Sequence, residues 1–210
     1  MVNVLSCFFG KLRSACYRTM VSKLNQFNVK QDYFVWIDLE MTGLDVNVHK
    51  IIEVACIITD TDLNMLHEGI RLVVHQPQHV FDNECSEWPK IHHGQSGLIE
   101  ESLKSDISVE KADSLVSDYI KSHTDYGRYY LSGNSVYMDK RFLEKYMPLT
   151  DQILHYRLVD VSCLKTLCRS WYDDLFKEVT KKNYAHRAFE DINESIQELK
   201  EYREKFFIRK

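Results

Sequence analysis

Two carboxylates alternate within one short apolar segment, residues 35–45. Asp38 and Glu40 are separated only by Leu39, and the residues before them favour a strand. Side chains two residues apart in a strand share a face, so the two acids are expected side by side. Like charges on an apolar strand repel each other and lose hydration, which a divalent cation relieves. The pair therefore indicates either a site for Mg²⁺ or Mn²⁺ or a solvated edge strand with two exposed acids.

Two further acids fall on the apolar stripes of predicted helices. Asp139 lies three and four residues before Phe142 and Leu143 in a helix expected over residues 139–147. Asp191 lies in a final helix expected from about residue 187 to 206, on the stripe of Ala188, Ile192, Leu199 and Phe206. A carboxylate on a core-facing stripe is unfavourable unless it is paired, used as a cap or bound to a metal. Added to the strand pair, these acids predict one converging cluster.

His186 precedes Asp191 by five residues and lies just outside the expected start of the final helix. A neutral imidazole close to an attacking water is a good general base near neutral pH. We interpret His186 as this base; the alternative is a loop histidine satisfied by backbone groups.

The order Asp-x-Glu, then Asp, then His-x4-Asp resembles the DEDDh exonuclease superfamily, and the surrounding sequence is similar to the oligoribonuclease family. The segments that carry this resemblance are Trp36-Ile37-Asp38-Leu39-Glu40-Met41-Thr42-Gly43-Leu44-Asp45, Gly133-Asn134-Ser135, His155-Tyr156-Arg157-Leu158-Val159-Asp160-Val161-Ser162 and Tyr202-Arg203-Glu204. The similarity covers roughly residues 33–207. The acid order is shared with proofreading exonucleases, whereas the first segment and His-Tyr-Arg are far more specific.

The resemblance implies 3′-to-5′ hydrolysis of very short RNA oligonucleotides, dinucleotides included, to 5′-nucleoside monophosphates by a two-metal mechanism. Asp38, Glu40 and Asp191 would hold two Mg²⁺ or Mn²⁺ ions per active site, with Asp139 as a ligand or acting through a water. The alternatives are a DNA-trimming or proofreading exonuclease of the same superfamily and a non-catalytic RNA-binding protein. The pattern has all its acids and its histidine, which argues against the non-catalytic protein.

The family's substrate-holding positions carry over one at a time. Leu44 resembles the residue that wedges between two bases, and Trp88 resembles a base-stacking residue suited to single-strand recognition. Turn packing and a core position are the respective alternatives. The residues that resemble a cap on the 5′ phosphate of the substrate are Ser135, His93, Tyr156 and Arg157.

The resemblance also implies a homodimer. Tyr156 and Arg157 would reach across a two-fold interface to the phosphate bound by the neighbouring subunit, so that each dimer contains two shared sites. An ordinary surface arginine with a local salt bridge is the alternative interpretation of Arg157.

The elements that must position these residues begin with an antiparallel meander, predicted as strands over residues 35–41, 51–60 and 65–75. Further strands are predicted at residues 128–132 and 158–161, and helices at 108–123, 139–147, 162–171 and about 187–206. The residues alone indicate a mixed sheet with helices on both faces. The resemblance implies an α/β, ribonuclease H-like fold with a mixed five-stranded sheet flanked by helices.

Length and composition fit one exonuclease domain, residues 32–210, without an internal linker or an apolar run long enough to span a membrane. The net charge of −4 argues against gripping long nucleic acid through many phosphates, but not against a short substrate. The 6 cysteines lack zinc-finger spacing and indicate free thiols in a reducing compartment.

Residues 1–31 form a basic extension without any acid; its charged residues are Lys11, Arg13, Arg18, Lys23 and Lys30. Such N-termini are typical of mitochondrial transit peptides, and an unstructured basic tail is the alternative. A mitochondrial and/or cytoplasmic location is therefore expected.

Overall fold

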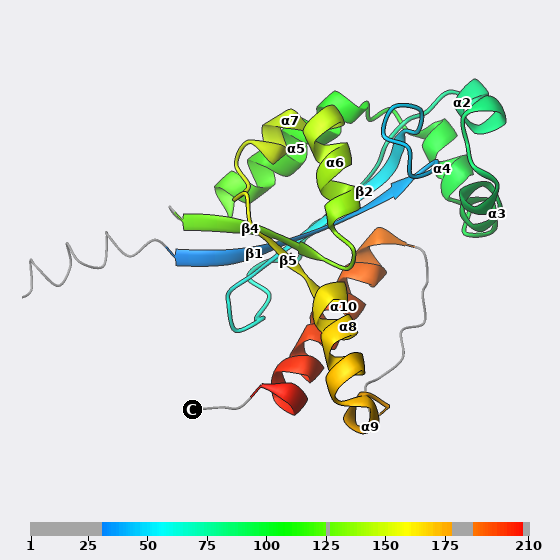
Figure 1. The fold of residues 1–210 in the computed structure, drawn as a ribbon. Helices are drawn as coiled ribbons and strands as arrows, with labels where there is room; N and C mark the ends of the chain where they lie inside the picture. The colour runs from blue at the N-terminus through cyan, green and yellow to red at the C-terminus, as the bar shows by residue number, and fades with distance from the viewer. Residues whose placement is uncertain (1–30, 125–126, 178–186, 208–210) are drawn as a thin grey trace, which may run out of the picture. The chain divides into compact units, whose positions relative to one another are not determined.

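A mixed five-stranded sheet with the order β3-β2-β1-β4-β5 forms the centre of the fold (Figure 1). The computed structural model describes residues 31–124, 127–177 and 187–207. β1 pairs antiparallel with β2 and β2 with β3, whereas β4 and β5 are parallel. The strands are β1 (Gln31–Met41), β2 (Ile51–Thr59), β3 (Ile70–Val73), β4 (Gly127–Gly133) and β5 (Leu158–Asp160). The predicted α/β class and mixed sheet are confirmed.

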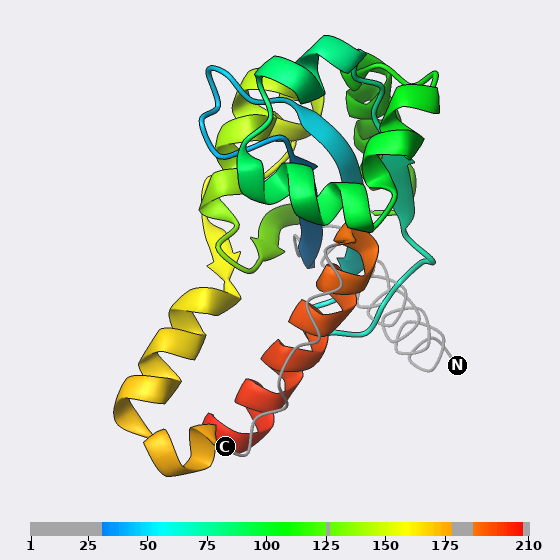
Figure 2. The same ribbon diagram turned by 90° about the vertical axis from the view of Figure 1, so that its right-hand side faces the viewer.

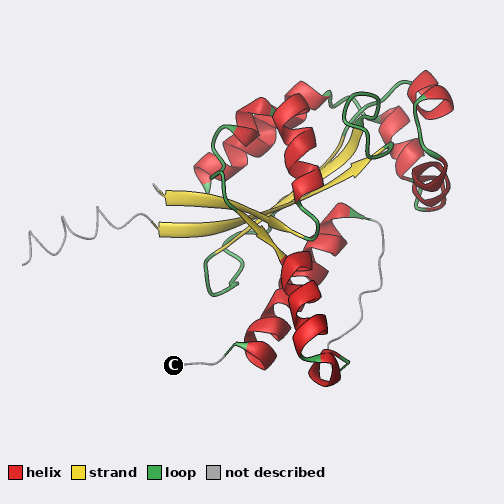
Figure 3. Ribbon diagram, in the orientation of Figure 1, coloured by secondary structure: helices red, strands yellow, loops and turns green. Residues whose placement is uncertain are grey.

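Helices cover both faces of this sheet (Figure 3). One side carries α5 (Val109–Ser122), α6 (Tyr137–Tyr146) and α7 (Pro148–Asp151). The other side carries α8 (Val161–Trp171) and α10 (Ala188–Phe206), which pack against each other (Figure 2). The remaining described helices are α2 (Gln78–Asn83), α3 (Glu87–Gln95), α4 (Leu98–Lys104) and α9 (Asp173–Phe176).

Alternate side chains of β1 enter two different apolar cores. Val35 and Ile37 pack with residues of α5 and α6, whereas Trp36 packs with residues of α8 and α10. Because side chains alternate along a strand, Asp38 and Glu40 lie on the face of Trp36. The two acids of β1 therefore face the side of the sheet that α10 covers.

The third strand is shorter than the predicted segment 65–75. Only Ile70–Val73 is a strand, and Met65 forms an isolated bridge with Thr59. Gly69 interrupts the extended backbone with φ +88°, and a Cβ there would lie 2.8 Å from the Phe189 ring and 2.9 Å from Ile57 Cγ1. A left-handed residue in so close a contact must be glycine, and it ends the regular pairing.

The other predicted elements are present with small shifts at their ends. α5 begins after Ser108, whose hydroxyl accepts from the Lys111 amide at 3.3 Å. α8 begins at Val161, one residue early, because Asp160 accepts from the Ser162 amide at 2.9 Å and caps the helix. α6 begins at Tyr137, two residues before the predicted start. Among the described residues, no helix is both long and apolar enough to cross a membrane.

Candidate active site

Three carboxylates converge where β1 passes the first turn of α10. Asp38, Glu40 and Asp191 each place one oxygen within 4.8 Å of the others, and all three residues are half-buried. β1 supplies two of them through its alternation, and α10 supplies the third from its first turn. The structure therefore brings together acids that lie about 150 residues apart in the chain, as the pattern predicts.

Asp139 stands beside this group. Its side chain on α6 is only 6% exposed, and its Oδ1 accepts a hydrogen bond of 2.9 Å from the Leu39 amide. Burial raises the pKa of Asp139 to about 7, against the lowering effect of the amides of Leu39 and of Asp139 itself, and Asp160 raises it further. The predicted helical stripe is correct, because Phe142 and Leu143 are fully buried on the same helix.

The charges of the neighbouring carboxylates also act on Glu40. Burial raises the pKa of Glu40 to about 8, and the carboxylates of Asp191, Glu53 and Asp139 add to the increase. Hard oxygen donors whose charges oppose one another are the ligands that Mg²⁺ or Mn²⁺ takes in proteins. The donor set therefore fits a divalent cation.

The helix α3 brings a histidine and an aromatic ring to the same region. His93 is 1% exposed, and its Nε2 lies 3.6 Å from Glu40 Oε2. Trp88 is 51% exposed and stacks on the His92 ring with centroids 3.9 Å apart. Trp88 is therefore not a core residue, and His93 contacts a predicted metal ligand; the predicted role of His93 at the 5′ phosphate stays a prediction.

The turn after β1 presents Leu44 to solvent at 63% exposure. This turn is tied to the start of α3 by the Ser86 amide, which donates to the Thr42 carbonyl at 2.8 Å, and by the Ser86 hydroxyl, 3.0 Å from His49 Nε2. A Cβ on Gly43 would lie 2.4 Å from that imidazole nitrogen, so the close approach requires glycine. The turn that carries Leu44 and the helix that carries Trp88 therefore share one set of contacts.

Ser135, Tyr156 and Arg157 are exposed. The Ser135 amide donates to Asp160 Oδ1 at 3.0 Å, which holds the residue at φ 52° in front of β5. Tyr156 is 75% exposed, and the Arg157 guanidinium lies 5.5 Å from the centre of its ring. In the part of the chain that the structure describes, no carboxylate pairs with Arg157, so the local salt bridge of the alternative interpretation is not found there.

A buried polar network joins two segments of the family resemblance. Asn134 Nδ2 donates to Glu198 Oε2 at 2.9 Å, the Tyr202 hydroxyl donates to Glu198 Oε1 at 2.7 Å, and Lys165 Nζ lies 3.2 Å from the same oxygen. Burial, reinforced by Glu198, raises the pKa of Tyr202. The network connects the turn after β4 with α8 and α10; the family-like segments contain Asn134 and Tyr202, but the sequence pattern does not identify Glu198 as their shared partner.

His186, the predicted general base, lies outside the described residues. The next residue, Arg187, is described and precedes α10 directly.

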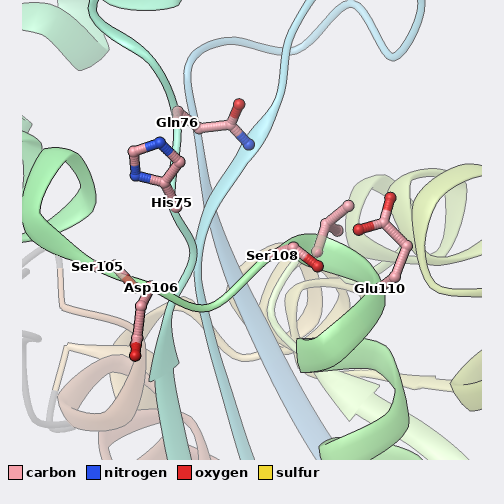
Figure 4. Close-up of a pocket in the computed structure, with 7 residues that line it drawn as sticks. His75, Gln76, Ser105, Asp106, Ser108 and Glu110 are labelled. Atoms are coloured by element: carbon pink, nitrogen blue, oxygen red, sulfur yellow. The ribbon is translucent and has the colours of Figure 1, made fainter.

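Away from the carboxylate cluster, a hollow of about 270 Å³ is lined by residues that follow β3 and by the start of α5 (Figure 4). None of the predicted site residues lines it. Its polar groups bond within the fold: His75 Nδ1 lies 3.1 Å from the Ser102 carbonyl, Gln76 donates to the Ile51 carbonyl and the Ser105 hydroxyl to that of Val73. The carboxylate cluster remains the candidate site.

Comparison with known proteins agrees with this geometry. The RNase_T family, described as exonuclease, matches residues 35–199. The mitochondrial oligoribonuclease of Homo sapiens is 48% identical over 176 residues, which are 84% of this chain and 74% of that protein. The chain belongs to the oligoribonuclease family. A probable oligoribonuclease from Drosophila melanogaster is 47% identical over 173 residues, 82% of each chain.

Solved structures at low identity show the same fold for this oligoribonuclease-family protein. An exonuclease I from Methylocaldum szegediense superposes with a TM-score of 0.65 at 13% identity, over 83% of this chain and 41% of that chain. The present chain thus spans less than half the length of that exonuclease I. The expected ribonuclease H-like fold is confirmed.

Proposed function

We propose that this protein is a 3′-to-5′ exoribonuclease that degrades very short RNA oligonucleotides to 5′-nucleoside monophosphates. The convergence of Asp38, Glu40 and Asp191 within 4.8 Å, in a chain of the oligoribonuclease family, carries the proposal. A metal-assisted phosphodiesterase needs such a carboxylate cradle beside the scissile phosphate.

Two Mg²⁺ or Mn²⁺ ions would be held by Asp38, Glu40 and Asp191, with Asp139 as a further ligand or acting through a water. When bound, such ions stabilise the charge that develops on the phosphate and on the leaving 3′ oxygen. Glu40 must be deprotonated to take part, and the His93 imidazole lies 3.6 Å from its carboxyl. His186 takes the proton of the attacking water in this proposal.

The substrate is held from two sides. Leu44 and Trp88 are exposed on segments joined by shared contacts, which suits a wedge and a stacking surface for two bases. Ser135, Tyr156 and Arg157 would cap the 5′ phosphate, since a guanidinium binds phosphate through two parallel hydrogen bonds. The cap would limit substrate length, because a longer chain needs room beyond it.

The phosphate cap is proposed to act across a homodimer. Tyr156 and Arg157 project from the turn before β5 at high exposure, and no described acid of the same chain pairs with Arg157. A two-fold axis close to this turn would let each subunit complete the site of its partner.

A substrate comparison tests the function. A 5′-phosphorylated RNA dinucleotide, a long RNA and a DNA of matched sequence are incubated with the full chain and Mn²⁺ at equal concentrations. The fastest release of mononucleotides is expected from the RNA dinucleotide, and EDTA should stop it. Preferred degradation of the long DNA would identify a DNA-trimming exonuclease instead, and binding of RNA without any mononucleotide release would indicate a non-catalytic RNA-binding protein.

Residues 1–31 are proposed to be an address for mitochondria, separate from the exonuclease domain 32–210. Their acid-free composition and the mitochondrial relatives support this. A chain starting at Gln31, where β1 begins, should keep its activity on dinucleotides, and residues 1–31 fused to a reporter should direct it to mitochondria. Loss of activity on truncation would refute the separation, and a reporter left in the cytosol would refute the address.

A further inference from the structure

Glu53 is a fully buried acid that the proposed reaction does not use. It lies on β2 directly opposite Glu40 of β1, and its side chain is 0% exposed. A buried carboxylate needs compensation for its lost hydration, and here two arginines provide it. Arg71 Nε donates to Glu53 Oε1 at 2.5 Å, and an Arg187 terminal nitrogen lies 3.5 Å from the same oxygen.

The second oxygen of Glu53 caps α10. Glu53 Oε2 accepts a hydrogen bond of 3.0 Å from the amide of Ala188, the first residue of that helix. The N-cap residue, Arg187, makes no side-chain cap of its own. The first amides of a helix have no partner within it, so the carboxylate on β2 satisfies one of them and complements the positive end of the helix dipole.

Arg187 fixes the same helix end from the side. Its guanidinium binds both carboxylate oxygens of Glu101 on α4 at 3.0–3.1 Å and donates to the Ser96 carbonyl at 3.2 Å. Glu101 also accepts from Arg71 at 2.8 Å, which closes a ring of two acids and two arginines. Paired guanidinium and carboxylate groups have a preferred geometry. The ring of two acids and two arginines therefore fixes the position of Arg187 as well as neutralising the buried charge.

The helix turn held in this way is the one that carries Asp191. The Asp191 amide donates to the Arg187 carbonyl at 3.0 Å, so a shift of Arg187 moves Asp191 with it. In sequence, Arg187 also directly follows His186. We infer that Glu53 and Arg187 are positioning residues for the reaction: together they seat the first turn of α10 so that the Asp191 carboxylate meets Asp38 and Glu40.

This inference rests on the proposed function, and its test uses metal binding as well as turnover. Glu53→Gln keeps the shape of the side chain and removes its charge. We expect Mn²⁺ to bind about 10- to 100-fold more weakly, as is usual when a residue that supports a metal ligand is lost. The electron paramagnetic resonance signal of free Mn²⁺ measures this binding. The kcat on a dinucleotide should fall by a similar factor, with KM changed less than about twofold because no base or phosphate contact is touched.

Substitutions of Arg187 test whether a conservative replacement restores Mn²⁺ binding. Arg187→Gln should weaken Mn²⁺ binding as Glu53→Gln does, and Arg187→Lys should restore part of it because the charge returns without the bidentate contact. The double variant should be no worse than the poorer single variant if both residues act through one helix turn. Asp32→Asn is the matched control, since it breaks the bidentate pair with Arg128, 2.6 and 3.0 Å, elsewhere on β1 and β4. It should leave Mn²⁺ affinity and kcat unchanged.

Folded Glu53→Gln and Arg187→Gln proteins with wild-type Mn²⁺ affinity and kcat would overturn the inference. If either variant fails to fold, Glu101→Gln decides, because its side chain is 42% exposed and its replacement removes the bidentate ion pair with Arg187 while Glu53 stays in place. Wild-type Mn²⁺ binding and kcat in Glu101→Gln would then count against the ring. A wild-type protein that binds Mn²⁺ but releases no mononucleotide refutes the proposed function alone, since the positioning role is judged on Mn²⁺ affinity.

Discussion

The carboxylate of Asp139 accepts a hydrogen bond of 2.9 Å from the backbone amide of Leu39, the residue between Asp38 and Glu40. A helix acid thus holds the backbone of the strand that carries two of the converging carboxylates. The contact has two effects: it satisfies the buried Leu39 amide, and it keeps the Asp139 carboxyl next to the other three.

Two variants of Asp139 should distinguish the hydrogen bond to the Leu39 amide from the role of the carboxyl in the cluster. Asp139→Asn keeps an oxygen that can accept from the Leu39 amide, whereas Asp139→Ala leaves this amide without its partner. We expect both proteins to lose most of their activity on a dinucleotide, and the Asn variant to be more stable than the Ala variant by about 1–3 kcal/mol. Urea unfolding measures the difference. Equal stability of the two variants would show that the hydrogen bond contributes little.

The raised pKa of Glu40 predicts how the stability of the metal-free protein depends on pH. The pKa of Glu40 rises from 4.5 to about 8 on folding, so between these values the folded chain keeps a proton that the unfolded chain has released. Stability is therefore greatest below about pH 4.5 with respect to this group and falls as the pH rises through about 8.

Glu40→Gln should remove this dependence. In EDTA, the variant should melt at a higher temperature than the wild type at pH 9, and the gain should vanish near pH 4. Glu110→Gln is the control, because hydrogen bonding to Ser108 lowers the pKa of that exposed acid and no gain at pH 9 is expected. An equal gain for Glu40→Gln at both pH values would contradict the account.

His186→Ala should lower turnover by about two to four orders of magnitude, the usual range for the loss of a general base. Mn²⁺ affinity and KM should change little. His67→Ala serves as control, since that histidine packs against His123 at a tilted ring angle and takes no part in the proposed site. A loss of Mn²⁺ binding in His186→Ala would make this residue a ligand and the assigned role wrong.

Mixing two inactive variants tests the shared sites of the proposed dimer. Asp38→Ala subunits lack a metal ligand and Arg157→Ala subunits lack a phosphate contact. If Arg157 acts on the neighbouring subunit, each mixed dimer contains one site without a lesion, and activity should partly return. Exchange of subunits, followed with two fluorescent labels, is the control. Demonstrated exchange without any return of activity would place Arg157 in the site of its own chain.

The periodicity of the sequence correctly predicts the face on which each acid lies, because each acid lies in a strand or a helix. The two-residue repeat of a strand aligns Asp38 with Glu40. The helical stripes that contain Asp139 and Asp191 are buried as expected, except that Phe206 is half-buried. The predicted strands and helices also occur in the predicted order, since Ile and Val dominate β2 and Ser108 marks the start of α5, but α2, α3, α4, α7 and α9 lie between them and are not predicted.

The sequence pattern does not predict the features of the fold and the site that depend on contacts between distant parts of the chain. Residues 78–104 form α2, α3 and α4, which are short and have narrow apolar faces, and no element was predicted there. Glu53 looks like an ordinary strand acid in the sequence, because its partners, the Arg71 and Arg187 side chains and the Ala188 amide, come from other parts of the chain. The contact of His93 with Glu40 is equally non-local.

Hydrolysis of an RNA dinucleotide by Asp38→Ala, measured beside the wild type in Mn²⁺, tests the central claim most directly. The wild type should release mononucleotides, and the variant should release none above buffer. Its melting temperature without metal should equal or exceed that of the wild type, because repulsion within the carboxylate cluster is relieved. Near-wild-type release of mononucleotides by a folded Asp38→Ala protein would contradict the account, since the reaction would then not depend on the cluster.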